Sequence, residues 1–313
     1  MDMKHFYKKL LSILLAVCLS VTIAPFSALA EEAENVCKIG EEGYASLDLA
    51  LNAIGSGETK TIELLADIDY DKGMVIENKN VVFALNEYDL NIINHSGIGL
   101  KVTDGTVGYT GSGEFNVTGT TTGVYVEDSN SAASVTFAVG TLQYGVNASM
   151  GKITVNGDVV GGSVGAQAVN SGEVTIKGNV KTIQDTGTGA EVWSNSKITI
   201  DGIIYAKNYI SIFGEMKNKS NGISDPAKPG YLKYGNAGDG IVWVRNTVCA
   251  IGVEEYETLE AALDDVLEWE EGQAPTTISL LKDINYDQSI ILDNKQITFE
   301  LNGFILNVYS EGE

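Results

Sequence analysis

The sequence predicts an all-β protein in which short parallel strands stack into a solenoid, with a short helix capping the first coil. Three observations predict this fold. One long stretch occurs twice, and a looser repeat lies between its two copies. The chain also has 35 glycines but only 4 prolines. That balance suits short strands separated by corners at which glycine is favoured.

The repeated stretch runs from residue 37 to 92 and again from 249 to 308. Three pairs of segments carry the match: 37–44 with 249–256, 61–67 with 277–283, and 81–86 with 297–302. Self-similarity at this distance indicates a repeated structural module.

Each copy is expected to open with a short strand and then a helix. Ser46 and Thr258 stand where helix N-caps are expected, and Glu260 adds an acid in the first turn of the second helix. The apolar stripes follow helical spacing and are Leu47, Ala50, Leu51 and Ile54, then Leu259, Ala262, Leu263 and Val266. Such a helix can cover the open end of a stack of strands.

Strands are expected after the first helix at 61–65, 73–76, 81–85 and 90–93. Beyond them, Gly123, Gly145, Gly165 and Gly189 each begin a unit, at intervals of 22, 20 and 24 residues. Repeats of this length with short strands are typical of a parallel β-solenoid, in which coils stack about 4.8 Å apart.

Strand alternation assigns the side chains of these units to faces. The inward positions are Val124, Val146, Ala166 and Ala190, then Val126, Ala148, Ala168 and Val192. One outward column is expected to hold Thr136, Thr154, Thr175 and Thr199, with Asn116 below them. A second is expected to hold Tyr125, Asn147, Gln167 and Glu191.

Four segments are expected along the chain. Residues 1–30 form a signal peptide, 31–213 a first module, 214–248 a linker with a small hairpin, and 249–313 the start of a second, truncated module. The second module is either vestigial or one member of a longer tandem array, and the repeat logic favours the array.

Residues 1–30 resemble a secretory signal because Lys4, Lys8 and Lys9 precede an apolar run, and Ala28–Ala30 offers a small-residue cleavage site. A lipoprotein cleavage box at 15–18 fits less well. No second apolar run is long enough to span a bilayer. The mature protein is therefore expected to be secreted or associated with the cell surface, without a membrane segment.

The composition also limits which molecules the protein can bind. The formal net charge is −22, and residues 1–30 contribute +2, so their removal leaves −22 − 2 = −24. Nucleic acids and anionic lipids are poor partners because their phosphates would be repelled. Cys37 and Cys249 occupy equivalent places in the two copies and are expected to be buried apolar residues rather than a disulfide or a zinc site.

Segments 256–263, 277–284 and 297–303 resemble the opening of pectate-lyase-like, right-handed parallel β-helix modules. Such modules occur in secreted and surface proteins of Gram-positive bacteria, often in adhesin-like chains. The resemblance implies a right-handed coil and an extracellular place. It does not imply one activity, because this fold carries lyases, hydrolases, adhesins and plain stalks.

The alternative function is a carbohydrate-active enzyme, either a polysaccharide lyase or a glycoside hydrolase. A lyase of this fold needs a strong base and usually calcium, and a hydrolase needs converging acids. Residues 99–209 contain no arginine, and their lysines have the spacing of solvated turn residues. The acids Asp264 and Asp265 lie on the second capping helix. We therefore expect no catalytic residues.

Two sets of residues are candidates for binding. Asp67, Asp69 and Asp71 alternate, so they can present oxygens to a calcium ion, although the EF-hand pattern is not met. The pattern favours the alternative, an acidic strand-to-turn corner exposed to water. The aromatic residues Tyr125, Tyr144, Trp193 and Tyr205 can stack on sugar rings of a glycan or a host-surface component, or else shield the corners of the coil.

Overall fold

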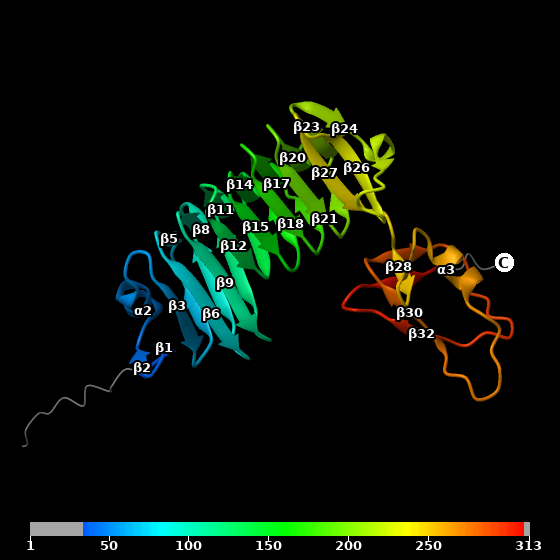
Figure 1. The fold of residues 1–313 in the computed structure, drawn as a ribbon, viewed down its shortest axis with the longest axis horizontal. Helices are drawn as coiled ribbons and strands as arrows, with labels where there is room; N and C mark the ends of the chain where they lie inside the picture. The colour runs from blue at the N-terminus through cyan, green and yellow to red at the C-terminus, as the bar shows by residue number, and fades with distance from the viewer. Residues whose placement is uncertain (1–33, 310–313) are drawn as a thin grey trace, which may run out of the picture. The chain divides into compact units, whose positions relative to one another are not determined.

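The computed structural model describes residues 34–309. The chain winds through three sheets, and each coil adds one parallel strand to each sheet, which confirms the parallel β-solenoid (Figure 1). We name these sheets A, B and C in the order in which a coil visits them. Sheet B has seven strands, so seven coils have all three strands. The predicted signal peptide lies outside the described residues, and the right-handed winding stays a prediction.

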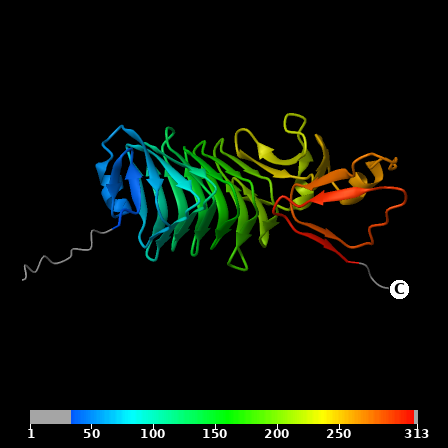
Figure 2. The ribbon, with the colours of Figure 1, turned by 90° about the horizontal axis from the view of Figure 1, so that it is seen from below.

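The strands of each sheet follow one another up the stack (Figure 2). Sheet A contains β3 (Thr59–Leu64), β6 (Asn80–Asn86), β9 (Thr106–Gly111), β12 (Ala132–Val135), β15 (Lys152–Val155), β18 (Glu173–Ile176), β21 (Lys197–Ile200) and β27 (Gly240–Arg245). Sheet B contains β4 (Ile68–Tyr70), β7 (Leu90–Asn94), β10 (Phe115–Gly119), β13 (Phe137–Gly140), β16 (Val159–Gly161), β19 (Val180–Thr182) and β22 (Ile204–Tyr205). Sheet C contains β5 (Met74–Glu77), β8 (Ile98–Thr103), β11 (Thr122–Glu127), β14 (Tyr144–Ser149), β17 (Val164–Val169), β20 (Thr188–Val192) and β23 (Asn208–Ile212).

The first coil is capped as predicted. Strands β1 (Cys37–Ile39) and β2 (Glu42–Tyr44) form a hairpin on the edge of sheet A, and α2 (Leu47–Ala53) follows. The side chain of Ser46 accepts a hydrogen bond from the backbone N–H of Leu49, and the predicted apolar stripe of α2 is buried. The helix therefore contributes apolar side chains to the core of the stack.

The last coil is covered by the segment that was expected to be a linker. β24 (Glu215–Lys217) pairs antiparallel with β23, and η1 (Lys219–Asn221) and β25 (Ile223–Ser224) follow. β26 (Tyr231–Asn236) and β27 form the predicted hairpin. The sequence did not predict that β27 also pairs in parallel with β21, which makes it the eighth parallel strand of sheet A.

The second copy repeats the first element by element. It contains β28 (Cys249–Ile251), β29 (Glu254–Tyr256), α3 (Leu259–Asp265), β30 (Thr276–Leu280), β31 (Ile284–Tyr286), β32 (Ile297–Glu300) and β33 (Leu306–Val308). Thr258 caps α3 by accepting a hydrogen bond from the backbone N–H of Ala261 at 3.1 Å. Cys37 and Cys249 are both fully buried, as predicted, and burial raises the pKa of each thiol to about 11.

The inward columns are confirmed, since all eight predicted inward residues of sheet C are fully buried. The second outward column is also confirmed, because Tyr125, Asn147, Gln167 and Glu191 are in register. The first column was partly wrong. Ser134, not Thr136, pairs with Thr154, because the chain turns after Val135 and leaves Thr136 at the corner. Asn116 lies in β10 of sheet B.

Strand β4 was also missed by the sequence analysis. It has three residues and lies within an acidic stretch, so its intrinsic strand propensity is weak. Pairing with β7 holds it in place. Within residues 34–309, no helix combines the length and apolar character needed to cross a membrane.

Candidate functional site

The predicted aromatic residues do not lie on one face. Tyr125 and Tyr144 belong to sheet C, Trp193 follows β20, and Tyr205 lies in β22 of sheet B. The amine of Lys101 is 5.7 Å from the Tyr125 ring centroid, and Trp193 packs on Phe213 with ring centroids 5.2 Å apart. The structure therefore builds no single platform from the four residues.

A different group of polar and aromatic residues gathers at the last strands of sheet A. We call it the sheet A cluster: Thr199, Asp201, Lys228, Tyr231, Trp243 and Arg245. The register pairs Thr154 with Thr175, then Thr199, and then Trp243. The outward threonine column thus ends in an indole ring, whose N–H donates to Asp225 at 3.0 Å.

Lys228 lies against both rings of the cluster. Its amine donates to the hydroxyl of Thr199 at 2.9 Å and lies 4.6 Å from the ring centroid of Tyr231 and 5.1 Å from that of Trp243. Burial lowers the pKa of Lys228. Among the described residues it has no carboxylate within salt-bridge distance, whereas Lys152 and Lys197 both pair with Glu173. The cluster thus presents a partly desolvated cation beside two aromatic faces.

Arg245 is the only arginine in the sequence, and the pairing of β27 with β21 brings it onto the stack. Its Nη1 donates to both carboxylate oxygens of Glu255 at 2.9 Å, and its Nη2 donates to the Tyr231 hydroxyl at 2.8 Å. That hydroxyl in turn donates to Asp201, and burial is the main cause that raises the pKa of Tyr231. The polar groups of Arg245, Tyr231 and Asp201 are already hydrogen-bonded to one another. This arrangement favours a role in holding side chains in position over a role as a base that abstracts a proton.

The sequence contained a signal for this cluster that the analysis missed. Val242-Trp-Val244 has the same apolar-x-apolar form as Ile198-Thr-Ile200, with the indole in the outward place. The second triplet lies inside the predicted linker, 214–248, where no further strand of the stack was expected.

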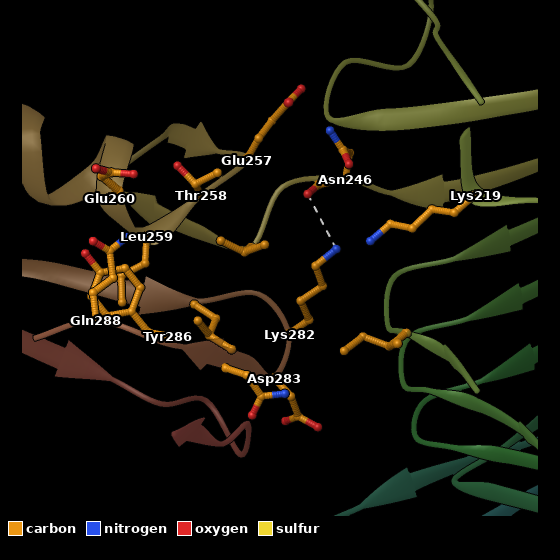
Figure 3. Close-up of a pocket in the computed structure, with 14 residues that line it drawn as sticks. Lys219, Asn246, Glu257, Thr258, Leu259, Glu260, Lys282, Asp283, Tyr286 and Gln288 are labelled. Carbon is orange, nitrogen blue, oxygen red and sulfur yellow. Dashed lines mark hydrogen bonds between the residues drawn. The ribbon is translucent and has the colours of Figure 1, made fainter. Parts of the chain in front are cut away.

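A pocket of about 460 Å³ lies around Lys282 (Figure 3). The Lys282 amine donates to the backbone oxygens of Arg245 at 2.9 Å and of Asn246 at 3.4 Å. Figure 3 shows the side chain of Lys219 reaching into the same region. Burial, reinforced by the positive charges of Lys219 and Arg245, lowers the pKa of Lys282 to about 8. A lysine in this state is partly neutral in mildly alkaline solution.

We expect the Lys282 side chain to titrate near pH 8, well below the ordinary lysine pKa of about 10.4. Burial penalises the charged amine in the folded state, and below pH 8 that penalty is fully present. Between pH 8 and about 10.4 the folded protein loses this proton before the unfolded chain does, so stability relative to a Lys282→Gln variant rises with pH. NMR titration of the Lys282 side chain, together with urea unfolding of both proteins at about pH 7.5 and 9.5, measures this. A midpoint above pH 10 would contradict it.

The calcium candidates lie along β4: Asp67 precedes the strand, Asp69 lies within it and Asp71 follows it. Asp67 accepts a hydrogen bond from the backbone N–H of Asp89 at 2.9 Å, and Asp69 accepts one from the side-chain amide of Asn91 at 2.9 Å. The second module repeats both contacts: Asp283 accepts from the N–H of Ile305, and Asn285 from the amide of Asn307. The repeated motif therefore joins each coil to the next. No group of three or more His, Cys, Asp or Glu side chains suited to a metal ion occurs within residues 34–309.

Replacing Asp67 with alanine is expected to lower the free energy of unfolding by about 1–2 kcal/mol, because the Asp89 N–H loses its acceptor at the corner. Asp71→Ala is the matched control, since none of the described residues donates a hydrogen bond to it, and it is expected to change stability by less than about 0.5 kcal/mol. Urea unfolding of the two variants compares them. Equal losses would show that the corner bond does not stabilise the coil.

No family model, curated protein or solved structure matches this chain. The fold alone assigns it to a class, the parallel β-solenoids.

Proposed function

We propose that this protein is a non-catalytic structural module of a secreted or cell-surface protein and that it contacts glycans through the sheet A cluster. The adhesin-like character expected from the sequence belongs to this proposal. The coils supply a repetitive scaffold, and the cluster supplies the contact.

One observation carries the non-catalytic part: outside the sheet A cluster, outward polar side chains pair from coil to coil. Asn91 bonds both Asp69 and Asn116, at 2.9 and 3.1 Å. Gln167 donates to Glu191 at 2.6 Å. Such ladders satisfy polar groups across neighbouring strands and stabilise the stack. The catalytic carboxyl groups of a glycosidase, by contrast, must flank one scissile bond.

The contact part is supported by the composition of the cluster. Trp243 and Tyr231 are half-buried rings beside the hydroxyl of Thr199; the amine of Lys228 lies over both, and the guanidinium of Arg245 lies over Tyr231 at 4.9 Å, so Trp243 is the ring with fewer cations against it. Aromatic faces flanked by hydrogen-bonding groups suit sugar rings, whose C–H faces are apolar and whose rims are polar.

A glycan array probed with residues 31–313, with calcium and then with chelator, tests the proposal. We expect saturable binding to one glycan class, reduced at least about tenfold by Trp243→Ala. Tyr205→Ala is the matched control because Tyr205 is exposed on sheet B, away from the cluster. Absence of binding, or equal loss in both variants, would contradict the glycan contact.

The enzyme alternative is tested on the same glycans. A polysaccharide lyase would create unsaturated ends that absorb ultraviolet light, and a hydrolase would create new reducing ends. We expect neither. Turnover abolished by changes in the sheet A cluster would replace the proposal with a catalytic one.

A further inference from the structure

Lys228 is held differently from the other lysines that lie over aromatic rings. Lys72 lies over a tyrosine ring and also pairs with the carboxylate of Asp48 at 2.6 Å. Lys101 lies over another tyrosine ring and pairs with Glu127 at 3.2 Å. The amine of Lys228 lies over two rings, and no carboxylate within residues 34–309 lies within salt-bridge distance of it. Aromatic faces therefore hold this ammonium group where a carboxylate holds the other two.

Three groups surround the ammonium of Lys228. The ring centroids of Tyr231 and Trp243 lie 4.6 and 5.1 Å from its nitrogen. The hydroxyl of Thr199 accepts a hydrogen bond from it at 2.9 Å. A primary ammonium has three N–H donors and no acceptor, and the electron-rich face of an aromatic ring attracts it. The cluster therefore already contains a place that fits an ammonium group.

Asp225 fixes both the ring and the turn that carries the lysine. Its carboxylate accepts a hydrogen bond from the indole N–H of Trp243 at 3.0 Å, and its backbone oxygen accepts one from the N–H of Lys228 at 2.9 Å. Pro226 and Pro229 flank the turn and restrict its backbone. The indole is therefore held through its own N–H and keeps its position when the lysine side chain moves away.

We propose that the sheet A cluster binds a primary ammonium group of a glycan, and that Lys228 occupies this place until the glycan displaces it. The inference rests on the proposed glycan contact and names its class: glycans of amino sugars whose nitrogen is not acetylated. The charges of Asp201 and Arg245 act on Lys228 in opposite senses, so the rings and the hydroxyl set the preference for a cation. The formal net charge of −22 attracts cationic polymers to the protein.

Lys228 then acts as a tethered competitor of the glycan. A ligand binds only the fraction of molecules in which the lysine has left the rings, so its apparent affinity is lowered by that fraction. Replacing Lys228 with glutamine removes the competing ammonium but leaves the rings and Thr199 in place. We expect this variant to bind a glucosamine oligosaccharide at least about tenfold more tightly than the wild-type protein does.

Calorimetric titration of residues 31–313 at fixed ionic strength measures this gain, with an N-acetylglucosamine oligosaccharide of the same length as the neutral probe. Lys181→Gln is the matched control, because Lys181 is exposed on β19 of sheet B and its loss changes the net charge equally. We expect less than about a twofold change in that variant. Adding Trp243→Ala to Lys228→Gln should abolish the gain, since the cation then loses one aromatic face.

NMR of the wild-type protein gives a second measurement that needs no variant. Ring currents of Tyr231 and Trp243 shift the ε-methylene protons of Lys228 while its amine lies over them. Saturation with the glucosamine oligosaccharide should return these protons to the shifts of a solvated lysine. Binding that leaves them unchanged would overturn the displacement.

The remaining outcomes separate this inference from the glycan contact itself. Equal gains in Lys228→Gln and Lys181→Gln would show an effect of net charge alone and would overturn the ammonium site. Binding of the neutral oligosaccharide that is lost in Trp243→Ala, without a gain in Lys228→Gln, would keep the glycan contact and overturn the ammonium site. A larger gain for a lysine peptide than for the glucosamine oligosaccharide would assign the place to a peptide and overturn the glycan class.

Discussion

Replacing Gly145 with alanine is expected to lower the free energy of unfolding by about 3 kcal/mol, the cost of overpacking a filled interior. Gly145 belongs to a column of in-register glycines at the corner between sheets B and C: Gly99, Gly123, Gly145, Gly165 and Gly189. A Cβ at Gly145 would lie 2.4 Å from Cγ1 of Val159 and 2.7 Å from the backbone oxygen of Gly165. The second contact is with backbone, so it cannot be relieved by a change of rotamer.

Gly108→Ala is the matched control for this prediction. Gly108 also lies within a strand, β9, but a Cβ there meets no atom within 4 Å. We expect that variant to keep its stability within about 0.5 kcal/mol. Urea unfolding followed by circular dichroism compares the two. If both variants unfold at the wild-type midpoint, sheets B and C do not lie as close together at Gly145 as the structure shows.

Replacing Phe115 with alanine is expected to cost about 4 kcal/mol, because it opens a cavity in the core. Phe115 is fully buried, and its ring meets Phe83 edge-on at 5.3 Å and Tyr109 at 6.1 Å between centroids. Coils of a solenoid contact only their neighbours, so the loss should concentrate in the coils around β10. Hydrogen exchange should show β6, β7, β9 and β10 destabilised more than β20 or β23.

The control for Phe115 is Phe213→Ala. Phe213 is 54% exposed and packs mainly on Trp193 at the end of sheet C. We expect that variant to lose no more than about 1 kcal/mol. If the two phenylalanine variants were equally stable, the phenylalanine core between sheets A and B would be contradicted.

Much of the stack could be predicted because the residues that determine each strand and helix cap lie close together in the sequence. Alternation placed Val146 and Ala166 inside and Asn147 and Gln167 outside, and the structure confirms both columns. Helix caps at Ser46 and Thr258 were equally clear, since the cap and the apolar stripe lie within a few residues of each other. Thr136 was misplaced because the strand ends at Val135, two residues earlier than the triplet pattern suggests.

The sheet A cluster was not predicted because its residues are far apart in the sequence. Successive strands of sheet A are 24 residues apart from Glu173 to Lys197, but 44 apart from Lys197 to Ile241 (197 − 173 and 241 − 197). One period after Lys197 the chain forms η1 and not a strand of sheet A, so the repeat is interrupted before β27. Only the pairing of β27 with β21 brings Trp243 beside Thr199.

The outward side chains stand in continuous columns, one coil directly above the next. Cysteine cross-linking tests this register. In an Asn147→Cys, Gln167→Cys variant the two thiols face each other in register, so mild oxidation should join them rapidly. In an Asn147→Cys, Val169→Cys variant the second cysteine pairs with Ser149 instead, and oxidation should leave the thiols free. If the second pair oxidised as readily as the first, the register of the stack, and with it the sheet A cluster, would be wrong.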